Sequence, residues 1–291
     1  MQASASISVC IVCCNEADRL GECLDSVLWA DEILLMDLES NDTSPDIAVS
    51  KGARVISHPP HPIVEPLRNK LAEYAKGNWI LALDPDERVA PELAQLLQKV
   101  AQYPDIDAIV IPRMNYDLGY PPTHPIQRYE PQLRMYRPER VAWPNFPNKL
   151  PIVPDEKKFI VPQKDELVLV HQRNRNVPEI VERIMRYAPE QAQSMHKAGE
   201  EFSAINMLMA LFKQVDKEFF RANAWIDGMP GIFRASILVI YKFYVWVALW
   251  QISGSMRSKS DDRLIQRLGM GAKFFWFFVK ALLKLGSMFR R

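Results

Sequence analysis

Short apolar runs alternate with helix-like patterns over the first hundred residues. Four apolar runs predict buried strands at Ile7–Cys13, Glu32–Leu38, Arg54–Ser57 and Trp79–Leu83. Between these runs, apolar residues recur at helical spacing and predict helices at residues 18–28, 45–51 and 67–76. Strands that are apolar on both faces and alternate with helices typically form a parallel sheet covered by helices. The pattern therefore predicts an α/β fold with a mostly parallel sheet.

The pattern changes after Gly119. Ten prolines fall between Pro121 and Pro162, which predicts extended, loop-rich structure with short strands. The strands are expected at Gln132–Tyr136 and Leu167–Val170, and helices at Pro178–Ala188 and Gln191–Val215. We therefore expect an α/β domain over residues 1–175 and a helical extension over residues 176–291.

Composition narrows the class of protein. Of the 291 residues, 24% are charged and 48% hydrophobic, which excludes a disordered or a fully membrane-embedded chain. The start lacks a basic segment ahead of a long apolar run, so no secretory signal is expected. Residues 254–291 hold nine Lys or Arg and two Asp, a net charge of +7 that leaves −6 for residues 1–253. An acidic body with a basic tail argues against a nucleic-acid partner.

Polar side chains follow three of the predicted strands. Asp84 and Asp86 come directly after one strand, Asp37 closes another, and Asn15-Glu16 close the first. The carboxyl ends of parallel strands meet at one edge of a sheet, where ligands of α/β proteins bind. Several acids in one crevice repel each other unless a cation or hydrogen-bond donors are present, and a divalent cation held on a nucleotide diphosphate fits that chemistry. The structural alternative is a set of helix caps.

At these positions the sequence resembles the family 2 glycosyltransferases of the GT-A fold, most of all the membrane-associated bacterial transferases of the lipopolysaccharide-core type. Three stretches carry the resemblance: VCIVCCNEADRLGECLDSVLWADEILLMDLESNDTS, LRNKLAEYAKGNWILALDPDERVAPEL and IDGMPGIFRASILVIYKFYVWVALWQ. It is dense across residues 6–98, thin over 120–175 and recognisable again over 225–252. The resemblance implies transfer of a sugar from a nucleotide-sugar, with Mg²⁺ or Mn²⁺.

The resemblance also implies roles for individual residues. Asn15, Glu16 and Asp37 would hold the base and ribose of the donor, and Asp42 lies in the same crevice. Arg68 and Asn69 would lie near the nucleotide or sugar. Asp84 and Asp86 would serve ribose, metal and diphosphate, with Asp86 acting in catalysis. His171 matches the position of a late metal-binding histidine, although a strand-end histidine without ligand is the structural alternative.

The sequence departs from the family pattern at the residue that should act as the base and activate the acceptor. The best-aligned position is Asn148, which cannot accept a proton as a carboxylate does. One alternative is a shift in register that makes Asp155 or Glu156 the base. A second is a polyprenyl phosphate acceptor, already anionic, held by arginines chosen from Arg113, Arg134 and Arg137. A third is a non-catalytic, membrane-bound nucleotide-binding scaffold.

The C-terminal region predicts contact with a membrane. Residues 235–252 form an apolar run of 18 residues with one charge, at the lower limit for a spanning helix. In the tail, Lys273, Lys280 and Lys284 share one helical face opposite phenylalanines. We expect amphipathic docking segments at about 229–253 and 269–291, lying on the anionic cytoplasmic face of the inner membrane. That location predicts a glycolipid or polyprenyl-linked acceptor. A core helix with a dimer contact, giving a homo-oligomer, and a spanning hairpin are the alternatives.

Overall fold

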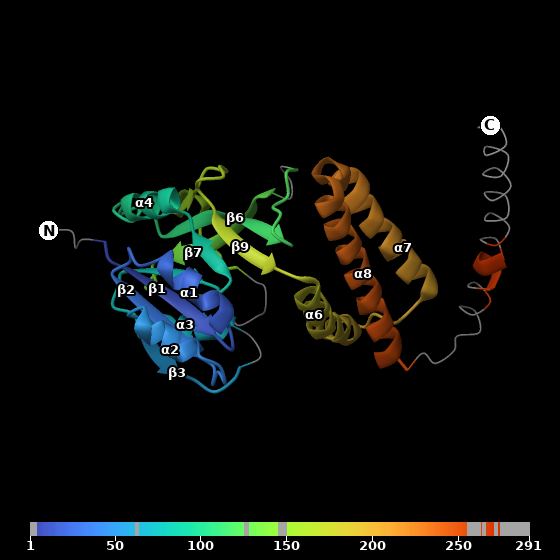
Figure 1. The fold of residues 1–291 in the computed structure, drawn as a ribbon, viewed down its shortest axis with the longest axis horizontal. Coiled ribbons are helices and arrows are strands. Elements are labelled where there is room, and N and C mark those ends of the chain that lie inside the picture. The colour runs from blue at the N-terminus through green and yellow to red at the C-terminus, as the bar shows by residue number, and fades with distance from the viewer. Residues whose placement is uncertain are drawn as a thin grey trace. The chain divides into compact units, whose positions relative to one another are not determined.

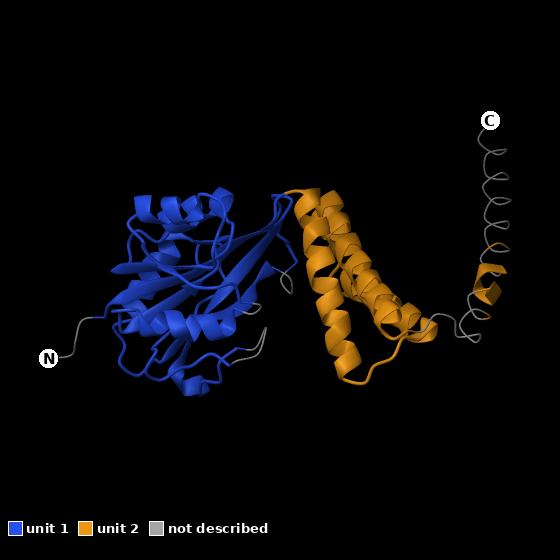
Figure 2. Cartoon of the chain, turned by 90° about the horizontal axis from the view of Figure 1, so that it is seen from below, with its two compact units in different colours: residues 1–175 blue, residues 176–291 orange. Residues whose placement is uncertain are grey.

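The computed structural model describes residues 5–61, 64–124, 128–144, 150–254, 263, 266–270 and 273. They fall into two compact units, residues 1–175 and residues 176–291 (Figure 2). The first unit is a sheet with helices and the second is helical (Figure 1).

One sheet organises the first unit. Its strands are β1 (Ile7–Cys13), β2 (Glu32–Asp37), β3 (Arg54–Ser57), β4 (Trp79–Leu83), β5 (Glu87–Val89), β6 (Ala108–Asp117), β7 (Glu130–Tyr136), β8 (Lys158–Ile160) and β9 (Leu169–Asn174). The order is β3-β2-β1-β4-β7-β6-β9-β5, with β8 beside β6. Strands β1 to β4 pair in parallel, whereas β7 is antiparallel to both β4 and β6. The predicted α/β fold with a mostly parallel sheet is confirmed.

Helices cover both faces of this sheet because its central strands are apolar on both sides. They are α1 (Ala17–Asp25), α2 (Ser44–Ser50), α3 (Glu65–Glu73) and α4 (Pro91–Val100). Alternate side chains of β1 enter different cores: Val9 and Ile11 join one, and Cys10 joins the other. Because successive side chains of a strand point to opposite faces, this division fixes the strand's register. The first core also holds α1 and α4, and the second holds α3.

The second unit is built from α6 (Val177–Lys197), α7 (Ala204–Val215), a π-helical segment (Asp216–Arg221), a short 3₁₀ helix (Ala224–Asp227) and α8 (Gly228–Ile252). A small core joins α6 to α8, with Ala188 and Ala192 packed near Val245, Trp246 and Leu249. Most of the predicted docking segment at 269–291 lies outside the described residues.

Helix boundaries in this unit differ from the sequence prediction. The predicted break near Pro189 is wrong, because Pro189 lies inside α6. The chain instead leaves α6 beyond Lys197, where Gly199 adopts a φ of +85° that glycine tolerates. A new helix then begins at Ala204, with the Ser203 hydroxyl accepting from Asn206 N. Pro189 was therefore not the helix stop that its residue type suggested.

Candidate functional site

The loops that follow β1 and β2 are joined by hydrogen bonds. Asn15, with φ of +56°, accepts at Oδ1 from Asn41 N at 2.7 Å, and its own N–H donates to Ser40 Oγ. Asp42 accepts from Ala17 N and from Ser44 N. The structure thus brings three predicted donor-binding residues, Asn15, Glu16 and Asp42, to neighbouring strand ends.

Asp37 lies at the end of β2, between these loops and the sheet. Its Oδ2 accepts from Ser40 N at 3.2 Å. Its Oδ1 is buried and has no hydrogen-bond partner within the described residues. A buried acceptor without a donor is costly, because its lost hydration is not replaced. Asp37 therefore presents an unsatisfied acceptor at the edge of the sheet where the polar loops gather.

Asp84 is held by two arginines from other elements. Its Oδ1 accepts from Arg68 of α3 at 2.7 Å, and its Oδ2 accepts from Arg134 of β7 at 2.5 Å. Burial acts to raise the pKa of Asp84, but the Arg134 and Arg68 guanidinium groups outweigh it and hold the pKa well below its usual range. The carboxylate is therefore ionised, with one arginine on each oxygen.

Arg134 is itself buried at the centre of this network. Its side chain is 3% exposed, and it donates to Glu87 Oε1 as well as to Asp84. Glu87 is fully buried and also accepts from Arg113 at 3.1 Å. This placement departs from the predicted contact of Arg134 with an acceptor, since its guanidinium already joins two carboxylates inside the unit. Arg137 also lies elsewhere, stacked on the Trp79 ring and donating to the Ile106 carbonyl.

Asn69 and Arg68 anchor the segment around Trp143. The Asn69 side chain donates to the Trp143 carbonyl at 2.9 Å and accepts from the Trp143 N–H at 2.8 Å. The Arg68 guanidinium lies over the Trp143 ring, 4.4 Å from its centroid. Residues 145–149, which include Asn148, begin two positions after Trp143 and lie outside the described part of the chain. The two predicted donor-side residues thus hold Trp143 in place.

Asp86 and His171 meet where β5 pairs with β9. Asp86 Oδ2 lies 3.1 Å from His171 Nε2, and Arg19 Nη1 lies 3.4 Å from the same oxygen. The side chain of Asp86 is 16% exposed and that of His171 is 8% exposed, so the pair is mostly buried but still in contact with solvent. Sequence positions 85 residues apart are joined here because β5 pairs antiparallel with β9. The structure therefore brings together two of the three predicted metal ligands.

Asp84, the third predicted metal ligand, has one arginine on each of its carboxylate oxygens. Within the described residues, no group of three or more His, Cys, Asp and Glu side chains could hold a metal. A magnesium-type ion keeps several water or phosphate ligands and needs only one or two from protein. Asp86 and His171 fit that requirement when a diphosphate supplies the remaining oxygens.

Asp155 and Glu156 do not reach this site. They lie in the short 3₁₀ turn Asp155–Lys157 ahead of β8, exposed to solvent, and Asp155 pairs with Lys158. Strand β8 runs parallel to β6 and pairs with its first residues, from Ala108, whereas His171 pairs with Asn115 near the other end. At about 3.3 Å per residue, the step from Ala108 to Asn115 spans roughly 20 Å. The sheet register therefore places both acids away from His171, and their role as general base stays a prediction.

Sequence reasoning missed four residues of the site. Glu87 forms ion pairs inside it, Arg19 contacts Asp86, and Asn115 and Glu130 lie behind His171. Each sits on a different element, and no spacing in the sequence links them. The alternation of β6, with polar Arg113 and Asn115 two residues apart in an apolar strand, is the one signal that could have found a member of the set.

Comparison with known proteins identifies relatives for most of the chain. The family model Glycosyl transferase family 2 matches residues 8–156. A TPR repeat-containing protein of Synechococcus elongatus is 31% identical over 140 residues, which are 47% of this chain and 35% of that protein. An uncharacterized glycosyltransferase of Rickettsia typhi is 22% identical across 87% of this chain and 89% of its own length. The lipopolysaccharide core biosynthesis glycosyltransferase LpsC of Rhizobium meliloti is 24% identical across 89% of this chain and 97% of its own length.

Among solved structures, a glucosyl-3-phosphoglycerate synthase from Mycobacterium tuberculosis, in complex with Mn²⁺, UDP and glucosyl-3-phosphoglycerate, overlaps part of the chain. The match has 18% identity and a TM-score of 0.34 and covers 46% of this chain and 57% of that one. An overlap this partial says nothing about the substrate of this chain.

Proposed function

The chain belongs to glycosyl transferase family 2, and we propose that it transfers a glycosyl unit from a nucleotide-sugar to a membrane-linked glycan or lipid. The proposed reaction uses Mg²⁺ or Mn²⁺ at the cytoplasmic face of the inner membrane. The observation that carries the proposal is the Asp86–His171 pair at the edge of the sheet where the polar strand ends gather.

The chemistry of this pair suits a divalent cation. A carboxylate oxygen and an imidazole nitrogen are both acceptable ligands, and at 3.1 Å they are close enough to share one ion after a small adjustment. A divalent ion bound here would neutralise the charge that develops on a leaving nucleoside diphosphate. The fold holds the Asp86 and His171 side chains in position. Asp86 follows the rigid strand β4, and His171 is held by its pairing to β5 and β6.

The donor nucleotide would lie along the loops after β1 and β2. Asp37 Oδ1 is a buried acceptor awaiting a donor, and the imide or amino group of a nucleobase would supply one. The Asp84 carboxylate would act as a fixed, ionised acceptor for ribose hydroxyls, because Arg68 and Arg134 hold it in place. Its assignment to the metal remains a prediction.

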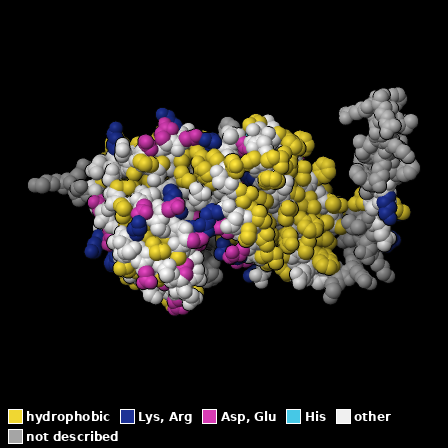
Figure 3. Space-filling model, in the orientation of Figure 1, with side chains coloured by type: hydrophobic (Ala, Val, Ile, Leu, Met, Phe, Trp, Pro, Cys, Tyr) yellow, Lys and Arg dark blue, Asp and Glu magenta, His cyan; other side chains and the backbone are white. Residues whose placement is uncertain are grey.

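The membrane part of the proposal rests on the second unit. The described residues contain one helix, Ala224–Ile252, long and apolar enough to cross a membrane, and 28% of its most apolar window is buried. A core helix of a soluble protein would be mostly buried. Hydrophobic side chains cover much of the visible face of this unit (Figure 3). The homology to LpsC, named for lipopolysaccharide core biosynthesis, supports an acceptor in the cell envelope.

A second candidate is transfer to a polyprenyl phosphate. The observation in its favour is that Asp155 and Glu156, the carboxylates expected to activate a hydroxyl, lie in an exposed turn away from His171. A phosphate acceptor is already anionic and needs no base. A basic side chain would still have to bind it, and of the three predicted arginines Arg113 is the one partly exposed at the site.

The test is release of nucleoside diphosphate from a panel of nucleotide-sugars mixed with Mn²⁺ and extracted membrane lipid. We expect release from one donor, its loss on chelation, and its dependence on Asp86. Product analysis separates a hydroxyl acceptor from a phosphate acceptor. A protein that binds the nucleotides but releases nothing with any lipid fraction is a scaffold, and the proposal then fails.

A further inference from the structure

The helices of the second unit carry charges and exposed apolar side chains on different sides. We propose that this unit lies in a single leaflet of the membrane. Helix α6 faces water, whereas α7 and the exposed face of α8 enter the apolar part of the leaflet, and lysines beside α7 contact anionic lipid headgroups. The inference rests on the membrane part of the proposed function, and it depends neither on sugar transfer nor on a metal.

Helix α6 is charged on the side that faces away from α8. Its Ala188 and Ala192 pack in the core shared with α8. Exposed charged residues recur at every fourth position on the other side, at Glu182, Arg186 and Glu190. Glu190 is two residues from each alanine, which is about 200° around the helix. Because ionised side chains are costly in the centre of a bilayer, α6 cannot enter the hydrocarbon together with α8.

Helix α8 is divided in the same way. Exposed apolar side chains follow one face at intervals of four, seven, four and three residues, at Met229, Phe233, Ile240, Tyr244 and Val247. The opposite face packs against α6 through Val245 and Leu249. Lys242, the one charge of the apolar run 235–252, precedes these two residues by three and seven positions and therefore lies on the α6 side. An in-plane α8 keeps Lys242 toward water, whereas a spanning α8 would bring it into the hydrocarbon.

Helix α7 is apolar on two sides, and protein covers only one of them. Met207 and Ala210 pack against the core of α6 and α8. The exposed apolar side chains lie at helical spacing on the other side, at Ile205, Leu208, Met209 and Phe212. Hydrophobic side chains run without a break over the part of the visible face where α7 and α8 lie (Figure 3). The two helices therefore present one apolar surface, of the kind that marks a contact site.

The charges beside this surface complement an anionic partner. Between residues 204 and 254, all of which the structure describes, the most exposed charged side chains are basic: Lys213, Lys217 and Arg221. The acids of this stretch are withdrawn, since Glu218 and Asp227 are buried and Asp216 pairs with Arg221. A second copy of the chain would present the same cations, whereas lipid phosphates neutralise them. The distribution of charge therefore favours a membrane over a dimer.

The bend between α7 and α8 adds aromatic side chains at the edge of this surface. Phe220 is 69% and Trp225 55% exposed. The Trp225 ring lies 5.4 Å from the Phe219 ring, and a buried ion pair between Asp227 and Arg234 closes the bend. Tryptophan is enriched where membranes meet water. The bend thus holds an interfacial aromatic residue in a fixed position beside the lysines.

Spin labels on the full-length protein measure which side enters the lipid. In a Cys14→Ser background the three remaining cysteines are buried, so a single added cysteine takes the label. Labels are placed by Met209→Cys and Phe212→Cys on α7 and by Glu190→Cys on α6. On vesicles of phosphatidylcholine and phosphatidylglycerol, EPR power saturation compares collisions with oxygen and with a water-soluble nickel chelate. We expect the α7 labels to meet oxygen but little nickel, and the α6 label to meet nickel.

The other results of this experiment overturn the inference. Labels on α7 that the nickel chelate reaches freely lie in water, and labels shielded from both reagents lie in a protein contact such as a dimer. Along α8, labels from Phe233→Cys, Ile240→Cys and Val247→Cys should lie at similar depths. A deepest position at Ile240 with both ends close to water would show a spanning helix. A protein that binds no vesicles refutes the inference and the membrane part of the proposed function, whereas the release of nucleoside diphosphate decides sugar transfer independently.

The headgroup contact is tested by removing charge. Lys213→Gln combined with Lys217→Gln should weaken binding to the anionic vesicles about 10- to 30-fold, or roughly fivefold for each cation. Binding to vesicles of phosphatidylcholine alone should stay unchanged. Lys76→Gln combined with Lys99→Gln is the matched control, because it removes the same charge from exposed positions of the first unit. Equal weakening by the two pairs would refute the contact of α7 lysines with headgroups, since the loss would then follow net charge alone.

Discussion

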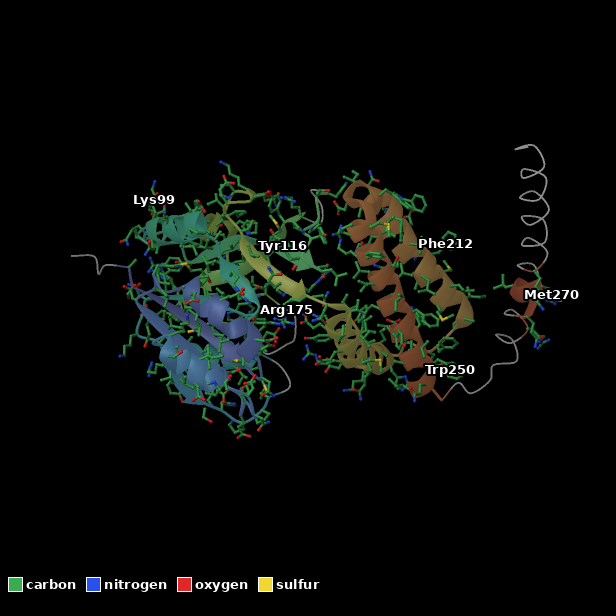
Figure 4. All side chains as sticks on the ribbon, in the orientation of Figure 1. Lys99, Tyr116, Arg175, Phe212, Trp250 and Met270 are labelled. Carbon is green, nitrogen blue, oxygen red and sulfur yellow. The ribbon has the colours of Figure 1, made fainter. Side chains whose placement is uncertain are left out.

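The two units of the chain distribute polar and apolar side chains in opposite ways. The first unit buries charged groups: Glu87 and Arg134 lie inside it, and a network of arginines surrounds Asp84. The second unit exposes apolar groups. Among the described residues, 21 exposed large hydrophobic side chains lie in residues 176–291 and 8 in residues 1–175. Phe212 of α7 and Trp250 of α8 are two of the 21 (Figure 4).

This difference supports different proposed contacts for the two units. Buried ion pairs are weak contributors to stability but hold side chains in fixed positions, as a site for a charged ligand requires. Exposed apolar area of this extent on a water-soluble surface is unfavourable and marks a contact surface. The first unit thus holds ion pairs in its interior, and the second unit carries an exposed apolar surface that we propose contacts a membrane.

The largest effect on stability is expected from removing the buried guanidinium group of Arg134. Arg134→Ala would leave the buried Glu87 and the partly exposed Asp84 without their shared cation, and should lower the free energy of unfolding by about 3–5 kcal/mol. Arg140→Ala is the control, since its ion pair with Asp107 is half-exposed and should be worth under about 1 kcal/mol. Urea unfolding of both variants measures the difference. Equal losses would contradict the view that Arg134 holds this interior together.

The next largest effect is expected on the rate of sugar transfer, with the protein still folded. Asp86→Asn keeps the shape of the side chain but removes its charge, and should lower transfer about 10²–10³-fold, the scale of losing one fixed electrostatic contact. Initial rates at saturating Mn²⁺ measure this, with circular dichroism to confirm folding. Asp165→Asn is the control, because Asp165 is an exposed carboxylate whose partners are Arg128 and Tyr129 and not Asp86 or His171. Unchanged turnover in Asp86→Asn would remove Asp86 from the site.

The apolar exterior is tested by removing one exposed ring. Phe212 is 81% exposed, and burying such a side chain is worth roughly 1.5–3 kcal/mol. Phe212→Ser should therefore weaken binding to anionic vesicles about tenfold or more, with unfolding nearly unchanged. Ile160→Ser is the control on the first unit, where Ile160 is 70% exposed.

Vesicle flotation distinguishes the occupants of this surface. High salt should release the full-length protein only in part, because salt screens the basic tail but does not weaken apolar contacts. A protein that stays off vesicles and sediments as a dimer would identify the apolar face as a contact between copies. Protease access to residues 255–263 from the far side of sealed vesicles would instead indicate a spanning chain.

The smallest effect is the acid sensitivity of the first unit. The pKa of Asp84 is lower in the folded than in the unfolded chain, so its ionised form stabilises the fold above the unfolded pKa of about 3.9. This contribution is lost as the pH falls below that value toward the folded pKa. Unfolding free energies should therefore fall more steeply below about pH 4 in the parent than in Asp84→Asn. Parallel curves would contradict the depressed pKa.

Local pattern was enough for the elements that fill the first core. Val9, Ile11 and the run Trp79–Leu83 are apolar on both faces, and such strands have one stable place, between two layers of helices. The same rule brought Asp37, Asp84 and Asp86 to one edge, because carboxyl ends of parallel strands meet. The buried strands and the shared position of their polar ends depend only on residues a few positions apart, so the sequence alone predicts them.

Partners across the sheet were decided by tertiary structure alone. Nothing near Asp84 in sequence indicates that Arg134, 50 residues away, would be buried against it, and the register of β8 determined that Asp155 and Glu156 lie far from His171. In α8 the sequence is apolar nearly all round, so the packing of α6 and α7 decides which side remains exposed. The physical reason is that ion pairing and packing depend on which strands and helices become neighbours, and that choice is made by the whole chain.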